Sequence, residues 1–321
     1  MKALLRFLGA GAIAALWAFQ PALAQQYPSR PIRILVPFAA GGLQDIEARE
    51  LSSSIQLRSG AAVVVENKPG GGGVIGMGEV ARAQPDGYTL LVAGASVTQI
   101  ALFRKDVGFD PAKDLVPVSQ LADGVSLIVT NKQTGAKDWP ELMALAKSRP
   151  GKLNYASFGP GSVQLGMESL KIAAGIDLTE IPYAGQAAYN TALLRNDVQL
   201  VLGVGFKAMA DAGDVIPLLA VGDKRNPQFP NIPTTTEAGY GRMIRSFGWV
   251  GLFAPGGTPA PILDRLAQEA AAFARSPDSQ KRAAAAAIVL IGNSPEEFRR
   301  VFDADARTWA EIAKAIRLQP Q

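Results

Sequence analysis

Residues 32–42 read IRILVPFAAGG, an apolar, β-branched run that ends in two glycines. Such a run indicates a buried strand followed by a turn. The residues after it favour a helix, because Ile46, Leu51 and Leu57 recur at helical spacing. A strand, a short loop and a helix in this order form the first half of a βαβ unit, so the opening of the chain predicts an α/β fold.

The same alternation continues along the chain. Further strands are expected at 62–66, 89–93, 126–130, 153–156, 178–181, 198–202, 216–221 and 249–253, with helices between most of them. Capping signals mark the starts of three helices, at Asp138 with Glu141, at Thr258 with Pro259 and at Ser294 with Glu297. The pattern predicts two doubly wound, mostly parallel sheets, and 321 residues suffice for two domains.

The chain is expected to form two lobes. Residues 223–233 contain three prolines and no periodic pattern, which is typical of a surface crossing. We therefore expect residues 1–24 to be removed, residues 25–124 and 224–321 to form the first lobe, and residues 125–223 to form the second. Two crossings between lobes leave a cleft. Ligands of parallel α/β sheets bind beyond the carboxyl ends of the strands, so the loops there should face this cleft.

The first 24 residues are expected to be a secretory signal peptide. Lys2 and Arg6 flank the start of an apolar run over 7–19, and Ala22 and Ala24 give a small-x-small cleavage site. A membrane anchor is the alternative reading, but the run is shorter than the ~20 residues that cross a bilayer. The mature protein is predicted to work outside the cytoplasm, in a periplasm.

The composition excludes several chemistries. The chain has no histidine and no cysteine, which removes Ser-His-Asp and Cys-His triads, disulfides and His-ligated zinc. Without Lys2 and Arg6, 30 basic and 28 acidic residues remain, a net charge of +2. No basic run alternates with aromatic residues, so a nucleic-acid partner is not expected. No metal, cofactor or catalytic residue is predicted.

Two loops at strand ends predict an anion site. The first is 37–42, and the second, SFGPGS, spans 157–162; each leads from a strand into a helix. Glycine lets the backbone approach a ligand, and a helix start presents free N–H groups and a partial positive charge. A plain turn is the alternative for the first loop, and a helix cap is the alternative for Ser162. Because the loops lie in opposite lobes, together they predict a shared carboxylate site.

Other strand-end residues are further candidates. Asp45 could cap the first helix, hold a bridging water or meet an ammonium group. Tyr183 and Gly185 could offer a phenol and an amide, with core packing as the alternative for Tyr183. Ser96 ends a first-lobe strand with a hydroxyl. The run KPGGGG at 68–73 lacks the Walker and Rossmann spacings and is interpreted as a loop near the cleft.

Several motifs resemble one family of binding proteins. They are YPSRPIR (27–33), VPFAAGGLQD (36–45), VVENKPG (64–70), PDGYTLL (85–91), PGKLNYAS (150–157), PYAG (182–185) and APGGTP (254–259). In this order they resemble Bug-type extracytoplasmic receptors, the solute-binding proteins of tripartite tricarboxylate transporters. The resemblance covers essentially the whole mature chain.

The resemblance implies a two-lobed periplasmic-binding-protein fold of the type II kind. It implies that the protein is a monomer whose lobes close on a small carboxylate, such as a di- or tricarboxylate, an aromatic acid or an amino acid. It also implies that the closed protein is bound by membrane transporter subunits or by a sensor protein. Carried over position by position, the ligand-binding residues are Phe38, Gly41, Gly42, Asp45, Ser96, Ser157, Gly159, Gly161, Ser162, Tyr183 and Gly185.

Three positions depart from the family pattern. Leu165 stands where a histidine is frequent, Val74 where an asparagine is frequent, and Gly203 where an aspartate is frequent. These changes predict a distal pocket suited to a more apolar acid. A hydrolase or lyase that uses a carboxylate with Tyr183 or a serine is the alternative function. The absence of a Gly-x-Ser-x-Gly elbow favours the binding protein.

Overall fold

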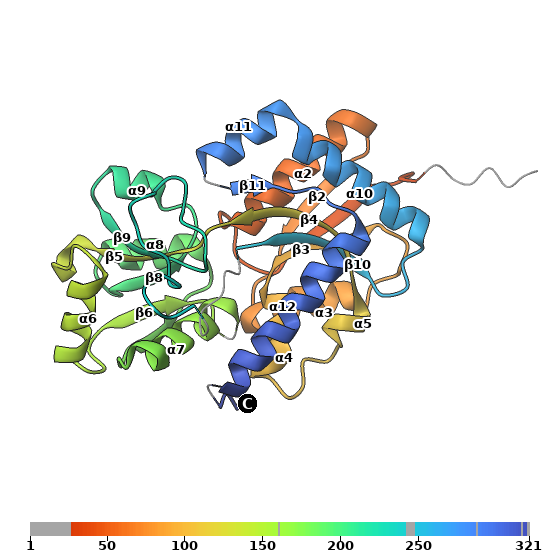
Figure 1. The fold of residues 1–321 in the computed structure, drawn as a ribbon. Helices are drawn as coiled ribbons and strands as arrows, with labels where there is room; N and C mark the ends of the chain where they lie inside the picture. The colour runs from red at the N-terminus through yellow and green to blue at the C-terminus, as the bar shows by residue number, and fades with distance from the viewer. Residues whose placement is uncertain (1–26, 160, 242–247, 287, 316, 320–321) are drawn as a thin grey trace, which may run out of the picture.

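A computed structural model describes residues 27–159, 161–241, 248–286, 288–315 and 317–319. Two β-sheets lie side by side, each covered by helices, and the strand β4 passes from one toward the other (Figure 1). The predicted α/β fold with two lobes is confirmed. The residue-by-residue division between the lobes stays a prediction, and the expected signal peptide lies outside the described residues.

The first sheet has the strand order β11-β4-β10-β3-β1-β2. Its strands are β1 (Ile32–Val36), β2 (Val63–Asn67), β3 (Thr89–Gly94), β4 (Leu115–Gly124), β10 (Val250–Pro255) and β11 (Ile288–Leu290). β1 pairs in parallel with β2 and β3, whereas β10 and β11 pair antiparallel with their neighbours. The first lobe is therefore built from both parts of the chain that flank the second sheet.

The second sheet has the strand order β7-β6-β8-β5-β9. Its strands are β5 (Leu127–Asn131), β6 (Asn154–Ser157), β7 (Thr179–Pro182), β8 (Leu200–Gly203) and β9 (Val215–Ala220). β6 pairs in parallel with β7 and β8, and β5 pairs antiparallel with β8 and β9.

Both sheets are thus mixed rather than mostly parallel as expected. Among the strands with antiparallel pairing, β5 and β10 enter a sheet from the opposite lobe. A strand that arrives from the cleft starts at the edge where β3 and β8 end, so it runs against them. The carboxyl ends of β1, β3, β6 and β8 therefore share the cleft with the amino ends of the entering strands.

Helices cover both faces of each sheet. In the first lobe these are α2 (Leu43–Ser59), α3 (Val74–Ala81), α4 (Ser96–Phe103), α5 (Pro111–Asp114), α10 (Ala260–Arg275), α11 (Pro277–Ala285) and α12 (Pro295–Ala315). In the second lobe they are α6 (Trp139–Ser148), α7 (Ser162–Ala174), α8 (Gln186–Leu194) and α9 (Lys207–Asp211), while short 3₁₀ turns η1 (Gly71–Gly73) and η2 (Lys132–Thr134) follow β2 and β5. None of the helices within the described ranges is long and apolar enough to span a bilayer.

The alternation of side chains along β1 explains the layers. Ile34 and Val36 pack with Leu51 of α2 and Leu266 of α10 on one face. Leu35 points to the other face and belongs to the core that contains α3 and α12. Successive residues of a strand point to opposite faces, so a strand with helices on both sides is mostly apolar, with Arg33 of β1 paired to Glu79 of α3 as the exception.

The predicted helix starts are partly confirmed. Ser294 and Glu297 form the expected reciprocal capping box of α12. Asp138 caps α6, but the Glu141 carboxylate accepts from Lys137 rather than from Asp138. Thr258 does not cap α10, because its hydroxyl donates to the carbonyl of Pro255, at the end of β10.

The two lobes are joined where glycines allow the backbones to touch. β4 ends at Gly124 and leads directly into β5, and Gly248 precedes β10. A Cβ atom at Gly248 would lie 1.8 Å from the carbonyl oxygen of Gly124, far inside van der Waals contact. Both crossings therefore meet at this glycine pair, which we call the hinge contact.

Candidate ligand-binding site

A pocket lies between the two lobes at the carboxyl ends of the strands. Its lining comes from the segments after β1, β3, β6 and β8, from α8, from the β4–β5 connection and from the start of β10. The residues are Phe38, Ala39, Gly42, Leu43, Gln44, Gly94, Ala95, Ser96, Ser126, Phe158, Gly159, Gly161, Ser162, Val163, Gln186, Tyr189, Leu202, Gly203, Val204, Gly248, Trp249 and Val250. The predicted cleft position is the one observed.

The described lining of this pocket carries no charged side chain. Its polar side-chain groups are serine and tyrosine hydroxyls, two glutamine amides and the indole N–H of Trp249, set among aromatic and aliphatic groups. The cavity volume of the pocket, counted as the space open to the centre of a water molecule, is about 80 Å³. Since one water needs roughly 10–15 Å³ by this measure, the pocket suits a small molecule.

Two helices from opposite lobes begin at the pocket. α2 starts at Leu43 after Gly42, and α7 starts at Ser162 after Gly161, and all four residues line the pocket. Ser162 is the first helical residue rather than the predicted cap. The amide groups of a first helical turn have no acceptor within the helix, and the helix dipole makes that end positive. The pocket thus attracts an anion without a cationic side chain.

Ser96 adds a hydroxyl that awaits a partner. Ser96 is the first residue of α4 and lines the pocket. It is 6% exposed. Its Oγ atom has no hydrogen-bond partner among the described residues. A Cβ atom at Gly161 would lie 3.6 Å from the Cβ of Ser96, so this serine stands beside the start of α7. Buried hydroxyls are normally paired, so a ligand is the natural partner of Ser96.

Asp45 holds the first loop and does not line the pocket. Its Oδ2 accepts the amide of Gly41 at 2.9 Å and Nε of Arg49 at 3.1 Å, and its Oδ1 accepts Nδ2 of Asn67 at 3.0 Å. Asn67 also donates to the carbonyl of Phe38. Burial alone would raise the pKa of Asp45, but the hydrogen bonds from Arg49, Gly41 and Asn67 outweigh it and lower the pKa. Neither Asp45 nor Gly41 has the predicted position in the pocket lining.

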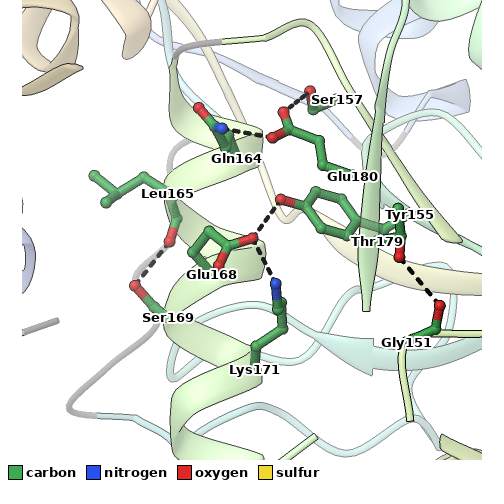
Figure 2. Close-up of polar contacts among 10 residues, drawn as sticks. All are labelled: Gly151, Tyr155, Ser157, Gln164, Leu165, Glu168, Ser169, Lys171, Thr179 and Glu180. Carbon is green, nitrogen blue, oxygen red and sulfur yellow. Dashed lines mark hydrogen bonds and ion pairs between the residues drawn. The ribbon is translucent and has the colours of Figure 1, made fainter. Parts of the chain in front are cut away.

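A similar arrangement holds the second loop. The hydroxyl of Ser157 donates to Glu180, and its Oγ accepts the amide of Gly159 at 2.8 Å. Figure 2 shows Gln164 donating to the other oxygen of the same carboxylate, at 2.5 Å. Ser157 is fully buried and lies behind the pocket rather than in its lining. In both lobes, therefore, an acidic side chain fixes the backbone of the loop that faces the ligand.

An aromatic pair forms the outer wall of the pocket. The rings of Phe38 and Phe158, from opposite lobes, are 5.3 Å apart. Both also line a second, outer crevice with the glycines of 70–73, Tyr183 and Ala184. Tyr183 and the glycine run therefore lie at the cleft, as expected for the run, but beyond the aromatic pair and outside the pocket.

Gly185 contacts the opposite lobe instead of the pocket. A Cβ atom at Gly185 would lie 2.9 Å from the Cβ of Ala39, which is closer than side-chain carbons pack. Its φ of 179° is ordinary extended backbone, so contact rather than strain requires glycine here. Ala39, Gly185 and the Phe38–Phe158 pair are the points where the lobes meet beside the pocket.

Comparison with known proteins decides the family. The profile of the tripartite tricarboxylate transporter family receptor matches residues 47–318. The chain belongs to this receptor family. The protein BugT of Bordetella pertussis is 31% identical over 300 residues, which is 92% of this receptor and 91% of that protein. The predicted resemblance to Bug-type receptors is confirmed.

Two solved structures extend the likeness to the fold. The periplasmic binding protein BugD has a TM-score of 0.87 at 33% identity, over 92% of this receptor and 100% of that chain. Rpa4515 of R. palustris, solved with adipate, has a TM-score of 0.86 at 28% identity, over 92% of this receptor and 100% of that chain.

The structure brings together six of the predicted site residues of this receptor. They line the pocket and are Phe38, Gly42, Ser96, Gly159, Gly161 and Ser162. The others, which do not line it, are Gly41, Asp45, Ser157, Tyr183 and Gly185. Ligand contact by the six stays a prediction. Of the three departures from the family pattern, only Gly203 lines the pocket, while Leu165 is buried in the core.

The lining side chains that sequence reasoning missed include Gln44, Gln186, Tyr189 and Trp249. Gln44 and Gln186 follow the glycines of their loops within the first helical turn, a position that could have identified them. Tyr189 and Trp249 carried no signal, because an aromatic residue in a helix or strand more often indicates a core.

Replacing Ser162 with alanine should weaken ligand binding to the receptor by about 1–2 kcal/mol, the scale of one hydrogen bond to a charged group. The hydroxyl of Ser162 lines the pocket at the start of α7. Isothermal calorimetry with a bound acid measures the change. Ser169→Ala is the control, because the Ser169 hydroxyl donates to Leu165 within α7 and lies outside the lining (Figure 2). An unchanged dissociation constant in Ser162→Ala would leave Ser162 only a helix-start role.

Proposed function

We propose that this receptor captures a small carboxylate in the periplasm and delivers it to the membrane subunits of a tripartite tricarboxylate transporter. One observation carries the proposal. The N-termini of α2 and α7, from opposite lobes, both lie at one pocket. The described lining of this pocket has no charged side chain. Free amide groups and partial positive charge at that place favour an anion of small size.

The acidic side chains near the pocket support a carboxylate rather than a cation as ligand. Asp45 and Glu180 point into the loops that they hold and do not line the pocket. A bound carboxylate therefore meets amides and hydroxyls, with no negative charge in the described lining. The adipate bound by the R. palustris relative, a protein of the same fold, fits this chemistry.

Capture would depend on the closing of the two lobes. Donors from both lobes contribute to one pocket, so an acid held by both binds the closed arrangement more tightly than an open one. A ligand shifts a conformational equilibrium by its difference in affinity for the two states. A membrane partner would then bind the surface that the two lobes form in the closed arrangement. A sensor protein without transport would read the same surface.

The lining gives less support to the alternative hydrolase or lyase. General acid–base catalysis needs a titratable group within hydrogen-bond reach of the substrate. The polar side-chain groups of the described lining are hydroxyls, amides and an indole N–H. The tyrosine among them, Tyr189, has a raised pKa because burial disfavours the phenolate.

A thermal-shift scan of carboxylic acids, each paired with its uncharged primary amide, tests the proposal. A ligand that binds only the folded protein stabilises it by about 3–4 kcal/mol at 100 to 1,000 times its dissociation constant. We expect saturable stabilisation by at least one small acid and none by its amide. NMR of the recovered acid checks that it is unchanged. Turnover, or equal stabilisation by amides, would contradict the proposal.

A further inference from the structure

Tyr189 brings a hydroxyl group to the pocket. It lies on α8, is 1% exposed and lines the pocket. Its ring packs on Phe158 at a centroid distance of 5.2 Å. No residue within the described ranges forms a hydrogen bond with its OH group. Tyrosine hydroxyls at such sites usually have a partner, and this one belongs to a residue of the pocket lining, so a ligand is the expected partner.

Gly203 makes the room that this hydroxyl occupies. A Cβ atom at Gly203 would lie 2.6 Å from the Tyr189 oxygen and 3.4 Å from the ring of Phe206. Any side chain at position 203 would therefore displace the hydroxyl. The pocket near it is lined by Leu202 and Val204, on either side of Gly203. Tyr189 thus offers a polar atom beside the aliphatic side chains of Leu202 and Val204.

Gln186 offers an acceptor on the same face of α8. Residues three apart on a helix are neighbours on its surface, and both Gln186 and Tyr189 line the pocket. Nε2 of Gln186 donates to the carbonyl of Val204 at 2.7 Å, which fixes the orientation of the amide. Its Oε1 receives no hydrogen bond from the described part of the chain. A hydroxyl donor and an amide acceptor are therefore both available to one ligand group.

We propose that Tyr189 and Gln186 together recognise a neutral hydroxyl group on the acid, away from its carboxylate. This inference rests on the proposed function. A ligand hydroxyl can accept from Tyr189 and donate to Gln186 at the same time. A second carboxylate only accepts, so it would leave Oε1 of Gln186 without a donor and place two negative oxygens beside it. No cationic side chain in the described lining offsets that charge. The preferred ligand class is therefore a hydroxylated monocarboxylate.

The phenol is suited to the donor role across the physiological range. Burial raises the pKa of Tyr189, so the group stays protonated and donates at neutral pH. Neither side chain has to change its charge on binding. Recognition of the hydroxyl then depends on hydrogen bonds alone, which predicts a modest and measurable preference.

Two series of acids test the inference by calorimetry. They are hexanoate, 6-hydroxyhexanoate and adipate, and benzoate, 4-hydroxybenzoate and terephthalate. In the series that binds, we expect the hydroxy acid to bind about 3- to 10-fold tighter than the plain acid, the effect of one hydrogen bond, and the dicarboxylate to bind less tightly than the hydroxy acid. Tyr189→Phe should remove most of this preference and leave the plain acid within about 2-fold of wild type.

Tyr155→Phe is the matched control. Wild-type Tyr155 is fully buried in the second lobe, like Tyr189. Its hydroxyl donates to Glu168, outside the pocket lining (Figure 2). The variant should keep the ligand preference even where stability falls. A dicarboxylate that binds tightest, or equal weakening of all three acids by Tyr189→Phe, overturns the inference and leaves the proposed function intact. If no acid of either series binds, the proposed function fails, and this inference fails with it.

Discussion

A receptor with valine in place of Gly185 is expected to fold normally and to bind its ligand about 10- to 100-fold more weakly. A Cβ atom at this position would lie 2.9 Å from the Cβ of Ala39 on the opposite lobe. Overpacking of a tight contact costs about 1–3 kcal/mol, and each 1.4 kcal/mol is tenfold in an equilibrium constant. The cost falls on the closed arrangement alone, so the apparent affinity decreases with the closed population.

Calorimetry with a bound acid measures this loss, and small-angle scattering reports whether the acid still makes the molecule more compact. Gly185→Ala should give a smaller loss in the same direction. Ala184→Val is the control, because it adds bulk one residue earlier at an exposed position. Wild-type affinity in Gly185→Val would show that the arrangement described here is not the one that binds ligand.

Asp45→Asn is expected to lower the free energy of unfolding by about 2–4 kcal/mol and to weaken binding. Both oxygens of Asp45 accept hydrogen bonds, from Gly41, Arg49 and Asn67. In the asparagine variant an NH2 group would replace one of these acceptor oxygens, so it would face a donor and could not accept its hydrogen bond. The loss of a charged acceptor that leaves buried donors unpaired costs several kcal/mol. The loop that faces the ligand would lose its fixed backbone as well.

The effect of Asp45→Asn should depend on pH. The pKa of Asp45 is lowered in the folded protein, so its ionised form stabilises the fold above the unfolded pKa of about 4. That contribution is lost as the pH falls through the lower, folded pKa. Denaturant unfolding should therefore show the full difference between wild type and variant at pH 7, and a shrinking one below about pH 4.

Asp138→Asn provides the comparison for this substitution. Asp138 caps α6 through one hydrogen bond to the amide of Glu141, and asparagine caps a helix about as well as aspartate. A loss in Asp138→Asn equal to that in Asp45→Asn would show that the network around Asp45 has no special role.

Strands with continuous apolar runs could be located from the sequence, including β5 and β10, but β4 could not. β1 and β3 are bounded by glycine or proline and have helices after them. β4 went unrecognised because Pro117, Ser119 and Gln120 interrupt its apolar pattern. The structure accommodates Pro117 at a register shift in the pairing of β4 with β10. Proline is found in sheets at such irregularities, which local patterns do not reveal.

The loops of the site could be predicted because strand, glycine and helix start are consecutive in the sequence. The roles of single polar residues could not be predicted in the same way. Ser157 lies at the end of a strand, where a serine often contacts a ligand. Its hydroxyl instead donates to Glu180, which comes 23 residues later in the sequence. Tyr189 lies within α8, where an aromatic residue more often indicates a core, and only the space left by Gly203 admits its hydroxyl.

The hinge contact places the pocket close to the pivot of the molecule. Gly248 touches Gly124 and also lines the inner pocket, whereas Phe38 and Phe158 form the wall toward the outer crevice, whose lining does not include Gly248. In a rotation about the hinge contact, atoms beside the axis travel least and atoms at the rim travel farthest. On the proposed function, such a rotation would turn a small adjustment around a bound acid into a large displacement of the outer edges, where a membrane partner could detect it.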